Sequence, residues 1–297
     1  MPPDGRSSLA VRLAERDLLV LDGATGTELE RRGAAAALPL WSARALIEVP
    51  ELVAAIHRDY AAAGADVLTA NTFRTQRRTL ERGGVGERAA ELTRTAVELA
   101  RSAARDGAAG REVFVVGSAP PLEDCFRPDL VPGDRELERE HSEHARHLAE
   151  AGVDGILIET MNSGREALAA LRAARATGLP TCVSFVCWEG AQLLSGESLQ
   201  AAIAGIEPAG PDAVLVNCLP ASNVAACLAV LRRAEPPFGL YPNLGAPTAG
   251  GGRSEALEPA DFAERIATWR DAGASLLGGC CGTTPAHTLA TVQRLRN

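Results

Sequence analysis

The chain has 297 residues, a hydrophobic content of 46% and a formal net charge of −8. Its length allows one large domain or two small ones with a substantial core. The acidic balance, without a dense Lys/Arg cluster, argues against nucleic-acid binding. Charged residues interrupt positions 1–20 and no run of 18 uncharged apolar residues occurs, which argues against a signal peptide and a membrane span. We therefore expect a soluble, cytoplasmic protein with no membrane partner.

Short apolar runs of strand character alternate with longer amphipathic segments, and they do so eight times. The predicted strands are residues 17–23, 65–72, 112–118, 153–160, 181–187, 212–218, 238–243 and 274–280. The segments between them carry apolar residues at i, i+3 and i+4, which is typical of helices packed on one face. Five of these segments end in a glycine just before the next strand, where it would turn the chain out of the helix: Gly64, Gly152, Gly178, Gly210 and Gly273.

Eight strand–helix units without a linker or a change in composition predict a single-domain (β/α)8 barrel, or TIM barrel, over residues 1–297. A doubly wound sheet is the alternative, but it commonly has fewer strands and a Gly-rich phosphate loop, and the chain contains no GxGxxG motif. In a barrel the carboxyl ends of all strands meet on one face, where active sites form.

Three cysteines fall at predicted strand ends. Cys218 closes the sixth strand, and Cys280 and Cys281 close the eighth. A Zn²⁺ ion held by three thiolates keeps one tetrahedral position open, which is typical of a catalytic site. Seven cysteines, an odd number, do not indicate a disulfide scaffold. Two other interpretations stay open: buried core cysteines, which suit Cys182 and Cys227 better, and a vicinal disulfide between Cys280 and Cys281.

Carboxylates also lie at strand ends. Asp22 and Glu159 follow apolar runs, so each is either hydrogen-bonded to loop amides or directed at a ligand. Three histidines, His141, His144 and His147, share one face of a charged helix. We expect that face to be solvated on the barrel exterior and not to bind metal.

Eight segments of the chain resemble the homocysteine S-methyltransferase family, and together they cover essentially its whole length. The most specific is GGCCGTTPAH (278–287) combined with VNCLP (216–220). The others are LDGATGTELERRG (21–33), LWSA (40–43), AGADVLTANTF (63–73), IETMNSGREA (158–167), LLSGESL (193–199) and YPNLG (241–245). The resemblance implies a barrel that carries zinc on Cys218, Cys280 and Cys281. It also implies methyl transfer from an onium donor, S-methylmethionine or S-adenosylmethionine, to homocysteine, giving methionine.

The resemblance also implies roles for the surrounding residues. Glu159 with Asp22 would bind the ammonium of homocysteine, and the amides of residues 24–27 with Thr72 would bind its carboxylate. Asn243 is a further substrate-site residue, which with Asn217 would fix the loop backbone. Three aromatic residues would either face the donor cation or fill the barrel mouth: Phe73, Trp188 and Tyr241.

Two segments depart from the family's pattern, residues 117–134 and the stretch after YPN, where Gly250–Gly252 indicate either a mobile lid or a plain loop. Both would overlie the site on the donor side. The donor is therefore left open, with betaine or another onium compound, and a thiol or selenol acceptor, as alternatives. A non-catalytic zinc- or thiol-binding barrel is the alternative from another class. A homo-oligomer is compatible with the sequence.

Overall fold

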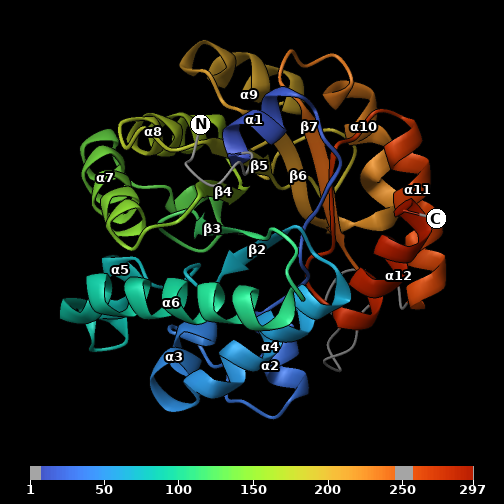
Figure 1. Ribbon diagram of the computed structural model, residues 1–297. Helices are drawn as coiled ribbons and strands as arrows, with labels where there is room; N and C mark the ends of the chain where they lie inside the picture. Colours follow the sequence, from blue (N-terminus) through green and yellow to red (C-terminus); the bar gives the residue numbers. More distant parts are fainter. Residues whose placement is uncertain (1–7, 245–256, 297) are drawn as a thin grey trace.

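The computed structural model describes residues 8–244 and 257–296, and a cylinder of eight parallel strands forms its centre (Figure 1). Each predicted strand is present. The strands are β1 (Leu19–Val20), β2 (Val67–Ala70), β3 (Phe114–Ala119), β4 (Gly155–Met161), β5 (Thr181–Phe185), β6 (Ala213–Pro220), β7 (Phe238–Asn243) and β8 (Leu276–Leu277).

The sheet closes on itself. Its strand order is β1-β8-β7-β6-β5-β4-β3-β2. The two ends of that order are joined because the amide of Asp66 donates to the carbonyl of Val20 and the amide of Asp22 donates to the carbonyl of Val67. This closure confirms the predicted TIM barrel, and the doubly wound alternative is wrong.

Helices surround the strands (Figure 1). They are α1 (Leu9–Ala14), α2 (Gly26–Arg31), α3 (Arg44–Glu48), α4 (Pro50–Ala63), α5 (Arg77–Arg82), α6 (Ala89–Gly107), α7 (Asp134–Glu150), α8 (Gly164–Arg175), α9 (Leu199–Ile206), α10 (Val224–Leu231), α11 (Pro259–Asp271) and α12 (Pro285–Arg296). The five predicted helix-ending glycines all have positive φ, from 69° at Gly210 to 104° at Gly64 and Gly273. Only glycine adopts this conformation at little cost, so these positions direct the chain from helix to strand.

The apolar residues form two layers. The larger layer fills the space between the strands and the surrounding helices. The smaller one lies inside the barrel, where Leu9 and Leu13 of α1 pack against residues of the strands such as Leu19, Leu215 and Leu276. Helix α1 therefore closes the amino-terminal end of the barrel, and the polar residues gather at the opposite end.

The face of α7 that carries the three histidines is buried, so the prediction of a solvated face is wrong. His141, His144 and His147 are 3%, 3% and 5% exposed. His144 Nε2 lies 3.1 Å from the carbonyl oxygen of Ser118, and His141 Nε2 lies 3.3 Å from a carboxylate oxygen of Glu166. Burial lowers the pKa of His144 to about 4. A neutral imidazole with one hydrogen bond can be buried at small cost. The charged residues next to these histidines in the sequence made the face look exposed.

Among the described residues, no helix combines the length and the apolar character that crossing a membrane requires.

Candidate active site

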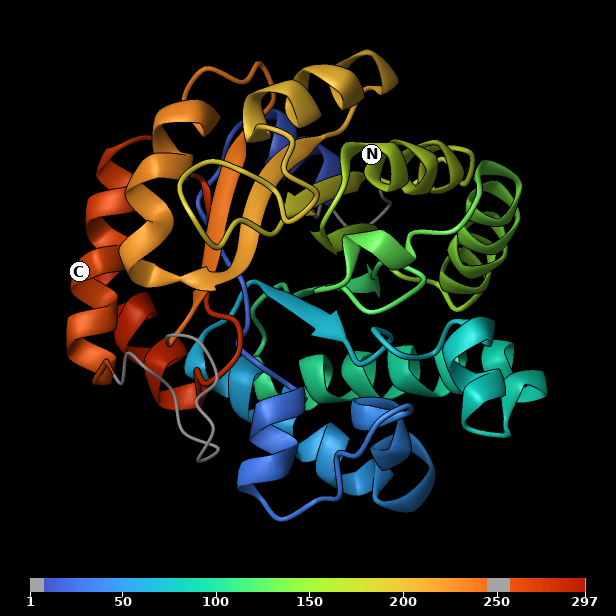
Figure 2. The same ribbon diagram turned by 180° about the vertical axis from the view of Figure 1, so that it is seen from behind.

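A cavity of about 780 Å³ opens at the carboxyl ends of the strands. The loops that follow β3 and β5 cover part of this end of the barrel (Figure 2). The cavity is lined from all sides of the barrel, by residues that include Asp22, Thr69, Phe73, Ser118, Cys125, Glu159, Trp188, Cys218, Tyr241, Asn243, Cys280 and Cys281.

The three predicted metal ligands meet in this cavity. The sulfur atoms of Cys218, Cys280 and Cys281 all lie within 4.8 Å of one another, and none of the three is in a disulfide. A tetrahedral zinc site with Zn–S bonds of about 2.3 Å needs sulfur separations of roughly 3.8 Å, so small shifts suffice to hold the ion. The vicinal disulfide is therefore not formed. Cys182 and Cys227 are buried, as the core interpretation predicts.

The cysteine cluster also needs a cation on electrostatic grounds. The pKa of the Cys218 thiol is raised well above its ordinary value, first by hydrogen bonding with Cys280 and Cys281 and then by burial. The hydrogen bond with Cys218 lowers the pKa of Cys280, but the hydrogen bond with Cys281, burial and the charge of Cys281 together raise it well above its ordinary value. Three adjacent sulfurs cannot ionise together without a compensating positive charge. A bound metal cation would supply that charge.

The Cys280–Cys281 pair is held by the glycines beside it. The amide of Cys280 donates to the carbonyl of Pro242 at 2.8 Å, so the segment continues alongside β7. A Cβ at Gly278 would lie 2.7 Å from the Cβ of Leu21, and Gly282 has a φ of 89°. Close approach to the loop after β1 and a left-handed turn therefore both require glycine here.

Cys218 is positioned by irregular backbone at the end of β6. Cys218 has a φ of 55° and Thr160 at the end of β4 has a φ of 61°, both rare for residues with a side chain. The pairing register shifts at both places. Asn217 joins the two, because its Oδ1 accepts from the Thr160 amide at 2.9 Å and its Nδ2 donates to Thr160 Oγ1 at 2.8 Å. Ser184 of β5 also donates to Asn217 Oδ1, at 2.7 Å.

Glu159 is buried and faces the cavity. Its carboxylate accepts hydrogen bonds from the hydroxyls of Ser118 and Tyr241, the latter at 3.3 Å. Burial raises its pKa to about 7, and the nearby Cys281 adds to this rise. No described residue pairs a cation with this carboxylate, so a substrate ammonium would be a favourable partner.

Asp22 has a different environment. Its two oxygens accept from the amide of Thr69 at 2.8 Å and from the hydroxyl of Thr69 at 3.0 Å. Burial raises its pKa to about 8, and the charge of Glu159 contributes. Asp22 therefore joins the ends of β1 and β2 as well as lining the cavity.

Thr72, predicted to contact the substrate, lies just outside the lining of the cavity. It is fully buried, is not among the residues that line the cavity, and donates its hydroxyl to the carbonyl of Ser118 at 2.9 Å. Its neighbours Asn71 and Phe73 do line the cavity, whereas the hydroxyl of Thr72 is turned to the end of β3. Of the amides at residues 24–27, that of Ala24 donates to Thr283 Oγ1.

Asn243 lies against the cysteine cluster. Its Nδ2 is 3.7 Å from the sulfur of Cys218. Its Oδ1 is buried and has no hydrogen-bond partner in the part of the chain that the structure describes. A buried amide oxygen without a donor is unusual, and a bound cation or substrate would satisfy it. The segment with Gly250–Gly252, predicted as a lid or plain loop, lies outside the described residues.

Aromatic residues surround the mouth of the cavity. The predicted residues Phe73, Trp188 and Tyr241 all line it. Trp188 is fixed by a hydrogen bond from its Nε1 to the carbonyl of Cys218 at 3.1 Å. The centre of its ring lies 5.0 Å from the centre of the Phe126 ring. Phe126 was not predicted from the sequence, because it lies in the loop that departs from the family's pattern.

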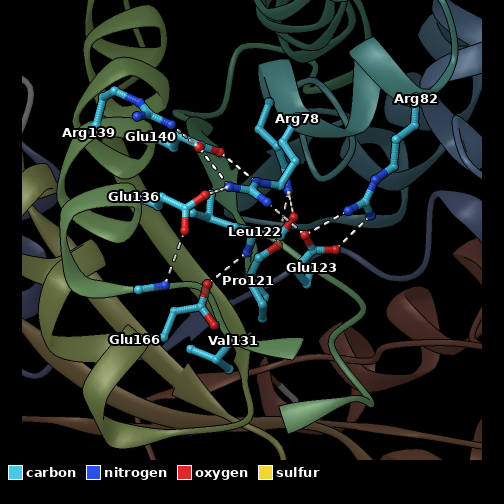
Figure 3. A network of polar contacts seen from close by, with 12 residues as sticks. Arg78, Arg82, Pro121, Leu122, Glu123, Val131, Glu136, Arg139, Glu140 and Glu166 are labelled. Atoms are coloured by element: carbon cyan, nitrogen blue, oxygen red, sulfur yellow. Dashed lines mark hydrogen bonds and ion pairs between the residues drawn. The ribbon is translucent and has the colours of Figure 1, made fainter. Parts of the chain in front are cut away.

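That loop, residues 120–133, is held from outside by a network of charges (Figure 3). Glu123 accepts from Arg78 and Arg82 of α5, and Arg78 also donates to Glu136 and Glu140 of α7. The loop that carries Cys125 and Phe126 along the cavity is thus tied to α5, and α5 is in turn tied to α7.

Comparisons with known proteins show the family of the chain. A family model described as homocysteine S-methyltransferase matches residues 19–295. Homocysteine S-methyltransferase 4 of Zea mays is 34% identical and is matched over 93% of this chain and 89% of its own length. Selenocysteine Se-methyltransferase of Brassica oleracea var. italica is 32% identical, over 93% of this chain and 88% of its own.

A solved structure is similar over its full length. The metallated form of the homocysteine methyltransferase MmuM from Escherichia coli superposes with a TM-score of 0.81, at 31% identity, over 96% of this chain and 98% of that one. The chain belongs to the homocysteine S-methyltransferase family.

Proposed function

We propose that this protein transfers a methyl group from an onium donor, S-methylmethionine or S-adenosylmethionine, to the thiol of homocysteine, giving methionine, and that it uses zinc. The observation that carries the proposal is the convergence of three cysteine sulfurs within 4.8 Å in a cavity that also contains two buried carboxylates. A ligand set made only of thiolates favours zinc over the harder divalent cations.

Cys218, Cys280 and Cys281 would hold the ion, and zinc bound there would keep the substrate sulfur ionised at neutral pH. The sulfur attacks the methyl carbon as the bond to the onium atom breaks, and the bonding electrons leave with the donor, which departs neutral at that atom. No general base is needed at the carbon because it loses no proton.

The residues of the chain bind and orient the amino-acid end of the acceptor. Glu159, held by Ser118 and Tyr241, accepts the substrate ammonium, and this contact favours its ionised form. Asp22 holds the ends of β1 and β2 together at the same place, which keeps the loop at residues 25–27 beside the substrate carboxylate.

A selenol acceptor is the second candidate. Support comes from the relative named selenocysteine Se-methyltransferase, which is about as similar to this chain as the homocysteine enzyme is.

The test is methyl transfer to homocysteine with a panel of onium donors, with the product detected by mass, alongside metal analysis. We expect one zinc per chain and turnover with at least one sulfonium donor. Cys218→Ser should lose both, whereas Cys125→Ser, in the same cavity but outside the cluster, should keep both. Zinc retained at full stoichiometry in Cys218→Ser would contradict the ligand assignment, and no turnover with any donor would contradict the function.

A further inference from the structure

Arg74 is a cavity residue without a hydrogen-bond or ion-pair partner in the described part of the chain. Two arginines line the cavity in the described residues, Arg31 and Arg74. Arg31 forms an ion pair with Glu28 at 2.6 Å. Arg74 makes no hydrogen bond or ion pair with any described residue, and its Nε is shut off from solvent without an acceptor. Buried donors normally have an acceptor, so a ligand that supplies one would explain why this Nε is unpaired in the free protein.

The guanidinium of Arg74 is held in place. Its central carbon lies 5.5 Å from the centre of the Phe73 ring. Phe73 in turn packs edge-on against Trp41 at 6.2 Å, so the stacking surface is itself supported. A planar guanidinium fixed on an aromatic ring presents paired N–H groups, which match the two oxygens of a carboxylate.

Arg74 lies on the side of the cavity that the loop after β3 covers. Gln76, two residues further on, donates its side-chain amide to the carbonyls of Pro121 and Leu122, at 3.0 and 3.3 Å. The charge of Arg74 also lowers the pKa of Cys125 in that loop, against the larger effect of burial, which raises it to about 12. The acceptor's ammonium partner, Glu159, is instead held by Ser118 and Tyr241.

The same side of the cavity presents aromatic faces for a cation. Phe126 and Trp188 form a ring pair at the rim and are 39% and 41% exposed. An onium group that approaches these rings is attracted by them, but an unpaired arginine nearby repels it. The repulsion becomes a net attraction when the donor itself carries a carboxylate for Arg74.

We propose that Arg74 is a specificity residue, which pairs with a carboxylate of the methyl donor and so selects carboxylate-bearing onium compounds over onium compounds that lack one. This inference rests on the proposed function and adds a residue that discriminates between donors. Lysine would replace the charge but not the paired N–H groups, so Arg74→Lys should retain only part of the effect.

The test uses the zinc-loaded full chain with homocysteine as acceptor. The donor with a carboxylate is S-methylmethionine, and trimethylsulfonium, which lacks one, is assayed as a donor or as a competitive inhibitor. Arg74→Gln should raise KM for S-methylmethionine about 10- to 100-fold, the effect of a lost charge-assisted pair. It should leave KM for homocysteine within about 2-fold and bind trimethylsulfonium as well as the wild type or better. Arg74→Lys should lie between. Arg31→Gln is the matched control, because it removes a cavity-lining charge that is already paired with Glu28. It should change neither the KM for S-methylmethionine nor the KM for homocysteine.

Three results would overturn the inference. A rise in KM for homocysteine alone would place Arg74 at the acceptor. An equal loss with both onium compounds, together with a lower melting temperature in both Arg74 variants, would make Arg74 structural. Absence of turnover by the wild type with every donor would remove the proposed function and the inference with it, and the wild-type assay, done first, separates that case from the other two.

Discussion

The two buried carboxylates of the cavity differ in what holds them. Within residues 8–244 and 257–296, Glu159 is held only by hydroxyls, whereas Asp22 accepts hydrogen bonds from the backbone amide and the hydroxyl of Thr69. Burial raises the pKa of both, to about 7 for Glu159 and about 8 for Asp22. Glu159 is thus available to a ligand near neutral pH, while Asp22 is engaged in the fold.

Glu159 should make ligand binding depend on pH. Its pKa of about 7 means that the ionised form, which attracts an ammonium, becomes dominant as pH rises through that value. The affinity for α-aminobutyrate, which has an ammonium but no thiol to bind a metal, should therefore rise between about pH 6 and pH 8. Calorimetric titration at several pH values measures this.

Glu159→Gln should flatten that dependence and weaken homocysteine binding by about 10- to 100-fold. The thiol 3-mercaptopropionate, which lacks the amino group, is the control and should be affected far less. Equal weakening of both thiols would instead make Glu159 a structural residue.

Asp22→Asn should change how stability depends on pH. In the unfolded chain Asp22 ionises near pH 4, but the folded protein keeps it protonated up to about pH 8. The folded state therefore binds the extra proton, and the stabilisation from this group is lost as pH rises from about 4 to about 8. The side-chain amide that replaces the carboxyl carries no charge, so the free energy of unfolding of the variant relative to wild type should increase across this range. Urea unfolding at about pH 5 and pH 8 tests this, and a constant difference between the two proteins would contradict it.

At the scale of elements, the site depends on where regular strands stop. The ends of β4 and β6 are irregular, with Thr160 and Cys218 in the left-handed region, and Asn217 connects them through the strand between. Backbone strain of this kind persists when surrounding hydrogen bonds over-determine it. Asn217 is thus a positioning residue for Cys218.

Asn217→Ala should loosen metal binding more than it harms the barrel. It leaves the Thr160 amide and the Ser184 hydroxyl without their acceptor, at a cost of about 1–3 kcal/mol each. Metal affinity should fall by roughly 10- to 100-fold, the usual effect of removing a residue that orients a ligand. Competition with a chelator measures the affinity, and circular dichroism checks the fold. Ser195→Ala, on an exposed loop hydroxyl, is the control. Unchanged metal affinity in a folded Asn217→Ala protein would contradict this role.

The loop after β3 is an element that the sequence could not place. Its anchors are long-range ion pairs from Glu123 to Arg82 and Arg78 of α5, which span 41 and 45 residues in sequence (Figure 3). Arg78 in turn pairs with Glu136 and Glu140 of α7. The apolar pattern of neither helix predicts these ion pairs, because the charged residues lie on faces that the sequence suggests are exposed to solvent.

For the whole molecule, we expect the barrel not to depend on the proposed metal. Its strands are closed by backbone hydrogen bonds and packed in two apolar layers, while the cysteine cluster joins only the ends of β6 and β8. A three-ligand site contributes less to folding than the closed site of a small zinc domain.

Removing the metal with a chelator should therefore abolish methyl transfer but leave the far-ultraviolet circular dichroism unchanged. Returning zinc should restore activity. Loss of the helical signal on chelation would show that the metal is structural.

The sequence by itself determined the barrel and the meeting of the three cysteines. Eight apolar runs became eight strands, five glycines ended helices with positive φ, and Cys218, Cys280 and Cys281 met at one end. These features rest on local periodicity and on one topological rule, that parallel strands of a barrel end on the same face.

The tertiary structure alone decided which polar side chains are free for a ligand. The histidine face of α7 is buried, Thr72 turns its hydroxyl to Ser118, and Arg74 is left without a partner among the described residues. Hydrogen-bond and ion-pair partners come from segments tens of residues away. The availability of a polar group is therefore a property of the packed chain and not of its local sequence.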